Sequence, residues 1–122
     1  MACQETERLQ ALRHLRLLDT APSEGFDRIT RMAAQIFDLP IAAVSLTDHD
    51  RQWFKSKVRI EQDTIPRLKA PCSEVAETAD VRVIPNFLDD PDYRDSLLAS
   101  SGIRFYAGAP LVTREGHGLG AL

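Results

Sequence analysis

Three histidines and two cysteines are the residues of this sequence best suited to bind a metal or to start a nucleophilic reaction. His14 falls in a predicted helix, and His49 and His117 fall in predicted turns. None of them has a second ligand nearby at the spacing of a metal site. Cys3 and Cys72 are too few and too isolated for a disulfide framework or a zinc site. The sequence therefore predicts no metal and no catalytic set, and we interpret the domain as non-enzymatic.

Three glycines, Gly116, Gly118 and Gly120, give a GxGxG pattern close to the end of the chain. The pattern lies in a predicted hairpin, and no helix follows whose N-terminus would meet an anion. A phosphate-binding loop is therefore not predicted here.

Arg104 and Tyr106 are candidates for contacts with a small molecule. They alternate with Phe105 along a predicted strand, so we expect both side chains on one face. Trp53 and Tyr93 would add aromatic walls to this face. Aromatic walls with one cation suit a small anion or an aromatic ring, and this combination predicts a ligand-binding site.

Arg104 also has a purely structural interpretation. It would pair with a loop carboxylate, either Asp89 or Asp92, and so hold a lid over the domain. A polar lid needs internal partners whether or not a ligand binds. The sequence leaves both interpretations open, and Asp89 stays among the candidate site residues.

Composition and charge restrict the class of protein. The 122 residues suffice for one domain with a real core, and 43% hydrophobic with 27% charged residues is typical of a globular fold. A net charge of −3 argues against a dedicated binder of nucleic acid or anionic membrane. No apolar run reaches the length of a membrane span, and the N-terminus lacks the apolar core of a signal peptide. We therefore expect a cytoplasmic protein.

Two amphipathic helices are predicted before the first strand. Residues 5–18 carry a wide leucine stripe, which would serve the domain core and a second subunit, with Leu9, Leu12 and Leu15 as the candidate dimer interface. Ser23 is the predicted N-cap of the second helix. Helical periodicity then assigns these apolar residues to the core: Phe26, Ile29, Ala33, Ile36 and Phe37.

Residues 41–58 predict the central hairpin, with a turn formed by the Asp48 to Arg51 segment. Later segments alternate between short regular elements and loops. The expected order is a loop at 59–71, a short helix at 71–79, a strand at 81–85, an irregular stretch at 86–91, a short helix at 93–99, a strand at 105–112, a turn at 113–118 and a strand from 119. Because the last strand stops at its fourth residue, we interpret the chain as a fragment of a longer protein.

Several of these segments resemble a GAF domain over nearly the whole chain. The matching motifs are LLDT at 17–20, FDRIT at 26–30, VSL-x-D at 44–48, DRQWFKS at 50–56 and GIRFYAGAPL at 102–111. The last two are the most specific. The resemblance is to the subset found on the N-terminal side of bacterial sensor kinases and diguanylate cyclases.

The resemblance implies an α+β, PAS-like fold for a single sensory domain of residues 1–122. Its central antiparallel sheet would carry helices on one face and a small-molecule pocket on the other, covered by the loops at 59–71 and 86–103. Family members continue with a C-terminal helix that pairs with the first helix and carries the signal to an output domain. The implied function is ligand sensing by a homodimeric regulatory domain. A scaffold for dimerisation without a ligand is the alternative.

Cys72 is compared with the cysteines of known GAF subsets. Those that attach a bilin have a histidine after the cysteine, where this chain has Ser73, so a bilin is not expected. The methionine sulfoxide reductases of the family use several cysteines, whereas the other cysteine here is Cys3 near the N-terminus, so redox catalysis is not expected. The NKFDE pattern of cyclic-nucleotide binders is absent, and the ligand stays unidentified. Cys72 is expected to line the pocket, and a thiol sensor with a lowered pKa is the weaker alternative.

Overall fold

The computed structural model describes residues 2–122, with side chains from Gln4 onward, so the side chain of Cys3 lies outside the described part. Five antiparallel strands form the main sheet in the order β3-β2-β1-β7-β6. A separate two-stranded sheet pairs β4 with β5. The main-sheet strands are β1 (Ala42–Thr47), β2 (Arg51–Val58), β3 (Thr64–Pro66), β6 (Pro110–Val112) and β7 (Gly118–Ala121), and the smaller sheet has β4 (Arg82–Ile84) and β5 (Tyr106–Gly108).

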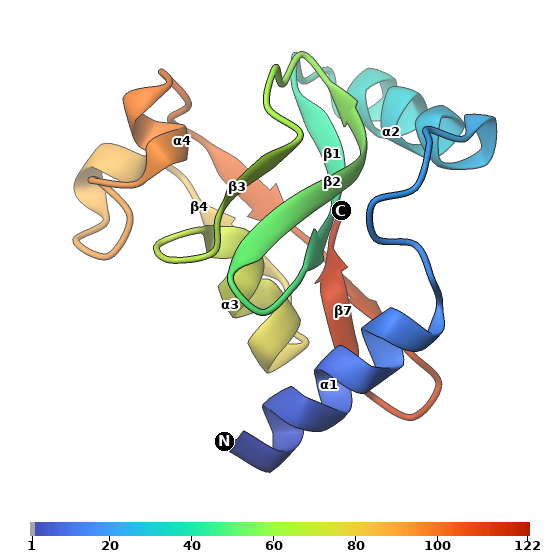
Figure 1. The fold of residues 1–122 in the computed structure, drawn as a ribbon. Coiled ribbons are helices and arrows are strands. Elements are labelled where there is room, and N and C mark those ends of the chain that lie inside the picture. Colours follow the sequence, from blue (N-terminus) through green and yellow to red (C-terminus); the bar gives the residue numbers. More distant parts are fainter. Residues whose placement is uncertain (1) are drawn as a thin grey trace.

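Helices cover both faces of the main sheet (Figure 1). On one face lie α1 (Ala2–His14) and α2 (Glu24–Ile36), and Leu12 of α1 packs on Leu46, Trp53 and Leu119. On the other face α3 (Pro71–Thr78) packs Val75 against Ala121. The α+β class is confirmed. Two short helices complete the second face, the 3-10 helix η1 (Phe87–Asp89) and α4 (Leu97–Ser100).

The predicted central hairpin is confirmed, because β1 pairs with β2 across the turn at 48–50. Asp48 Oδ1 accepts a hydrogen bond from the backbone N–H of His49 at 2.8 Å, as expected of a turn aspartate. The short helix at 71–79 is also confirmed, with Pro71 in its first turn. Both elements depend on residues within the segment itself, Asp48 in the turn and Pro71 in the first turn of the helix, and these residues can be read from the sequence.

Other predicted boundaries are wrong. The first helix ends at His14 and not at residue 18, since Arg16 and Asp19 have positive φ and reverse the chain. The expected loop at 59–71 contains β3. The strand expected at 105–112 is interrupted at Ala109, and its halves β5 and β6 belong to different sheets.

The core assignment of the second helix is wrong for three of its residues. Ile29, Ile36 and Phe37 are 48%, 70% and 69% exposed. The helix approaches the sheet through Thr30, which is buried and lies 2.5 Å from Ser56 Oγ of β2. Ser23 stands at the N-cap, but its side chain makes no capping hydrogen bond. Periodicity identified an apolar stripe, and its members Phe26 and Ala33 are half-buried while the other three face solvent.

The leucine stripe of α1 mostly serves the domain itself. Leu9 and Leu12 are 8% and 0% exposed, whereas Leu15 is 46% exposed. A second subunit would therefore reach Leu15 but not Leu12, which lies in the core of the protomer. The prediction that all three leucines could contact a second subunit is therefore wrong for Leu9 and Leu12, which are buried in the domain itself.

Candidate functional site

Three of the six candidate site residues come together on the face covered by α3. Cys72, in the first turn of α3, is buried beside Tyr106 of β5, and the Tyr106 ring lies 6.2 Å from that of Phe87. The Phe87 ring in turn contacts Tyr93 edge-on at 6.4 Å. These aromatic rings fill the space between the sheet, α3 and the segment 86–99, and they form a packed floor rather than an open pocket.

Burial dominates the electrostatics of this floor. It raises the pKa of the Cys72 thiol, which outweighs the hydrogen bonds to Tyr106 and Ser45 that lower it. It also raises the pKa of Tyr106, and it raises the pKa of Tyr93 to about 12. The lowered pKa expected of a thiol sensor is therefore wrong for Cys72, because the apolar surroundings disfavour the thiolate more than the helix terminus favours it.

The other three candidates lie elsewhere. Trp53 is on the opposite face of the sheet, packed on Leu12, and Asp89 is exposed at the surface. Arg104 donates from Nη1 to the carbonyl oxygens of Ala99 at 2.8 Å and Ile103 at 3.1 Å. Among the described residues, neither the expected aromatic site around Arg104 nor its alternative ion pair with Asp89 or Asp92 is formed. Arg104 precedes β5, so strand alternation does not place it on the face of Tyr106.

A cavity of about 320 Å³ opens between the two loops that were expected to cover a pocket. Its lining comes from segments 59–62 and 97–103, with Ile65 of β3 and Ile41 beneath. Leu98 and Ile103 also pack on the aromatic floor. The volume lies within the range of small-molecule sites, which are mostly apolar with a few polar groups.

Polar side chains stand at the rim of this cavity, from Arg59, Glu61, Gln62 and Ser101. The sequence predicted the two loops but none of these residues as site residues. Arg59 carries a positive φ of 61°, so the chain bends sharply where β2 leaves the sheet. That bend, which no local motif signals, brings the loop over the aromatic floor.

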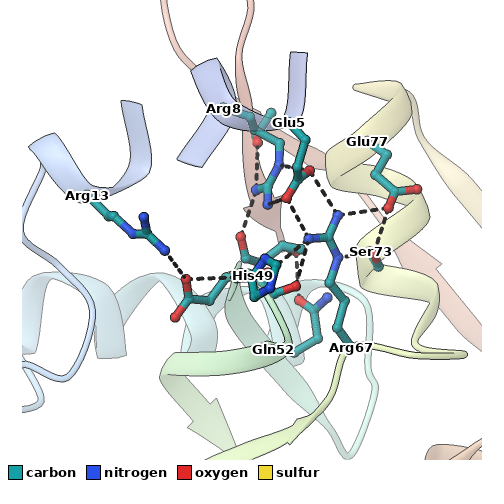
Figure 2. A network of polar contacts seen from close by, with 11 residues as sticks. Glu5, Arg8, Arg13, His49, Gln52, Arg67, Ser73 and Glu77 are labelled. Atoms are coloured by element: carbon teal, nitrogen blue, oxygen red, sulfur yellow. Dashed lines mark hydrogen bonds and ion pairs between the residues drawn. The ribbon is translucent and has the colours of Figure 1, made fainter. Parts of the chain in front are cut away.

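A network of charged side chains connects α1 to α3 at one end of the sheet (Figure 2). Arg67, between β3 and α3, donates to both carboxylate oxygens of Glu5 at 2.7 and 3.1 Å and to Glu77 of α3 at 2.8 Å. Its Nε also donates to Ser73 at 2.9 Å. One guanidinium thus holds the first helix and the third together.

Arg8 completes the network from the side of α1. It is 5% exposed, donates to the Glu5 carboxylate at 2.9 and 3.0 Å, and donates to the carbonyl of Thr47 at 2.7 Å. The hydrogen bonds from Arg67 and Arg8 lower the pKa of Glu5 from 4.5 to about 2. Glu5 is therefore ionised throughout the physiological range, and the network is permanently charged.

Comparisons with known proteins agree on the fold. The family model for the GAF domain matches residues 21–122. A cyclic di-GMP phosphodiesterase of Pseudomonas aeruginosa is 39% identical over 114 residues, which are 88% of this chain but only 19% of that protein. The chain thus spans about a fifth of that relative.

Solved structures with low sequence identity share the architecture. The GAF domain of A. aeolicus nlh2 in an inactive state superposes with a TM-score of 0.65 at 10% identity, covering 98% of this chain and 77% of that one. A free methionine-R-sulfoxide reductase from Neisseria meningitidis, solved with its substrate, gives a TM-score of 0.65 at 16% identity, covering 96% and 70%. At these identities the likeness concerns the fold.

Proposed function

Because the chain belongs to the GAF domain family, we propose that it is a non-catalytic regulatory module that binds a small molecule and reports its presence to a signalling output. The cavity between segments 59–62 and 97–103 is the observation that supports this proposal most directly. It lies on the face where the family resemblance implies a pocket. The buried Cys72, with its raised pKa, argues against thiol chemistry at that face.

Binding in this cavity would stabilise one arrangement of the two loops. Arg67, further along the β2–α3 connection, is bonded both to α3 and to Glu5 of α1. A shift of that connection therefore changes the position of α1 relative to the sheet. In this scheme the ligand selects one population of α1 positions, which an attached output domain would read.

The parent protein is proposed to be a bacterial signalling protein of the sensor kinase or diguanylate cyclase type, acting in the cytoplasm. The motifs at 50–56 and 102–111 support this, and the Pseudomonas relative is named as an enzyme of cyclic di-GMP signalling. Within residues 2–122 no helix has the length and apolarity that crossing a membrane requires.

Filling the cavity is expected to abolish ligand binding without unfolding the domain. Ile103→Trp places a large side chain into the cavity, whereas Val112→Trp adds the same side chain at a position that is 44% exposed in β6. Native mass spectrometry after incubation with a bacterial small-molecule extract should show excess mass that denaturation removes, in the wild type and in Val112→Trp only. Excess mass retained by Ile103→Trp, or found in no variant, contradicts the proposal.

We also propose that the module is a homodimer whose interface includes the exposed Leu15. Leu15→Lys is expected to give monomers in sedimentation velocity, because burying a lysine charge between subunits is unfavourable. Leu88→Lys, at a position that is 51% exposed on η1, is the matched control and should leave the dimer intact. A Leu15→Lys protein that still sediments as a dimer would place the interface elsewhere.

A further inference from the structure

A β-bulge in β2 turns two consecutive side chains toward α2. Val44 pairs with Ser56 and Ser45 pairs with Phe54, so Lys55 has no partner in the ladder. Ser56 Oγ donates to Asp27 Oδ1 of α2 at 2.6 Å, and Lys55 reaches the segment before α2. Bulges redirect side chains in this way, and here the side chain of Lys55 points toward the face that α1 and α2 cover.

Lys55 is buried without a carboxylate partner. The residue is 6% exposed, and its Nζ donates to Thr20 Oγ1 and to the carbonyl of Ala21, both at 2.7 Å. The Phe26 ring lies 5.6 Å from Nζ. None of the ion pairs among residues 2–122 includes Lys55. A buried ammonium held only by neutral groups lacks the opposite charge that normally offsets its lost hydration.

A groove of about 750 Å³ opens beside this ammonium, on the opposite face of the sheet from the first cavity. Its other two cations are already neutralised: Lys57 pairs with Asp63 at 2.7 Å, and Arg31 pairs with Glu24. Its apolar lining includes Pro22, Trp53 and Val58. Lys55 is therefore the one cation of this groove that has no carboxylate partner among the described residues.

We propose that this groove binds a small organic monocarboxylate, with Lys55 as the partner of the carboxylate and the apolar walls in contact with the hydrocarbon part. A single free positive charge suits a monoanion. Asp27 also lines the groove and forms none of the ion pairs among residues 2–122, so it repels a doubly charged anion such as a phosphate monoester more strongly than a monoanion. The proposal is independent of the ligand site on the other face, and either can fail without the other.

Trp53 gives a direct signal for this groove, because it lines the groove and is the single tryptophan of the sequence. Cyclohexanecarboxylate, titrated at constant ionic strength, is expected to change the tryptophan emission in a saturable way. Cyclohexanecarboxamide has the same shape without the charge and should bind at least about tenfold more weakly, as expected for losing a charge-assisted hydrogen bond. An equal response to the amide, or no saturable response to the acid, overturns the proposal.

Two variants localise the effect. Lys55→Met keeps the length of the side chain without its charge and should remove the preference for the carboxylate, whereas Lys69→Met, at an exposed position outside the groove, should retain it. A preference that survives in a folded Lys55→Met protein contradicts the assignment. If thermal melting shows that Lys55→Met is unfolded, the comparison of acid and amide on the wild type decides.

Discussion

Gly118→Ala is expected to destabilise the domain by about 3 kcal/mol or more, because the added methyl group has no space. A Cβ at position 118 would stand 1.9 Å from the carbonyl oxygen of Ala76 in α3. That oxygen belongs to the backbone, so the clash can be relieved only by moving α3 away from β7. Urea unfolding, followed by circular dichroism, measures the loss.

Gly25→Ala is the matched control. A Cβ at Gly25 meets nothing within 4 Å, and the residue lies inside α2, where alanine is favoured over glycine by roughly 0.5–1 kcal/mol. This variant should be as stable as the wild type or slightly more stable. A Gly118→Ala protein with the stability of the wild type would show that α3 does not pack on β7 as closely as described.

Arg67→Met is expected to cost about 2–4 kcal/mol at pH 7, because it leaves two carboxylates and a buried serine without their shared donor. Arg67 binds Glu5, Glu77 and Ser73 and is largely buried, with 15% of its side chain exposed. Arg31→Met is the control: it removes an exposed ion pair with Glu24 on α2 and should leave the urea midpoint unchanged within error. Equal effects of the two substitutions would contradict the role given to Arg67.

The ion pair between Glu5 and Arg67 also predicts how the stability of the domain depends on pH. The folded-state pKa of Glu5 is about 2, below its ordinary value of 4.5, so the unfolded chain takes up the proton first. The stabilisation is complete above pH 4.5 and is lost as the pH falls toward 2. Because Glu5 is partly exposed, we expect roughly 1–2 kcal/mol from this carboxyl. Arg67→Met should show a smaller loss over this range, since only Arg8 then lowers the pKa.

Local sequence patterns predicted the elements whose chemistry is local. The hairpin of β1 and β2 follows from an apolar run, a turn aspartate and an aromatic return strand, and α3 follows from Pro71 at its start. The end of α1 was missed because it depends on Arg16 and Asp19, neither of them glycine, adopting positive φ. That conformation is set by tertiary contacts, such as the two hydrogen bonds from Arg51 to Asp19 at 2.7 and 2.8 Å.

Candidate site residues were harder to predict than elements. Strand alternation placed Arg104 beside Tyr106, but the strand begins only at Tyr106, and the backbone carbonyl of Arg104 accepts instead from the N–H of Phe87 at 2.7 Å. Trp53 was assigned to the wrong face for a similar reason. Trp53 packs on α1 and Phe54 packs on Leu98 of α4, so the face of β2 that the loops cover depends on how later segments cross the sheet, which no pattern within β2 reveals.

The attachment of α2 has a thermodynamic consequence. Its buried contact with β2 is the polar pair of Thr30 and Ser56, with the half-buried Asp27 beside it, while Ile29 and Ile36 already face solvent. Lifting α2 from the sheet would thus expose little new apolar surface, and the heat capacity change of that local opening is small. Its free energy varies almost linearly with temperature, unlike that of the apolar core beneath α1, whose stabilisation weakens on cooling.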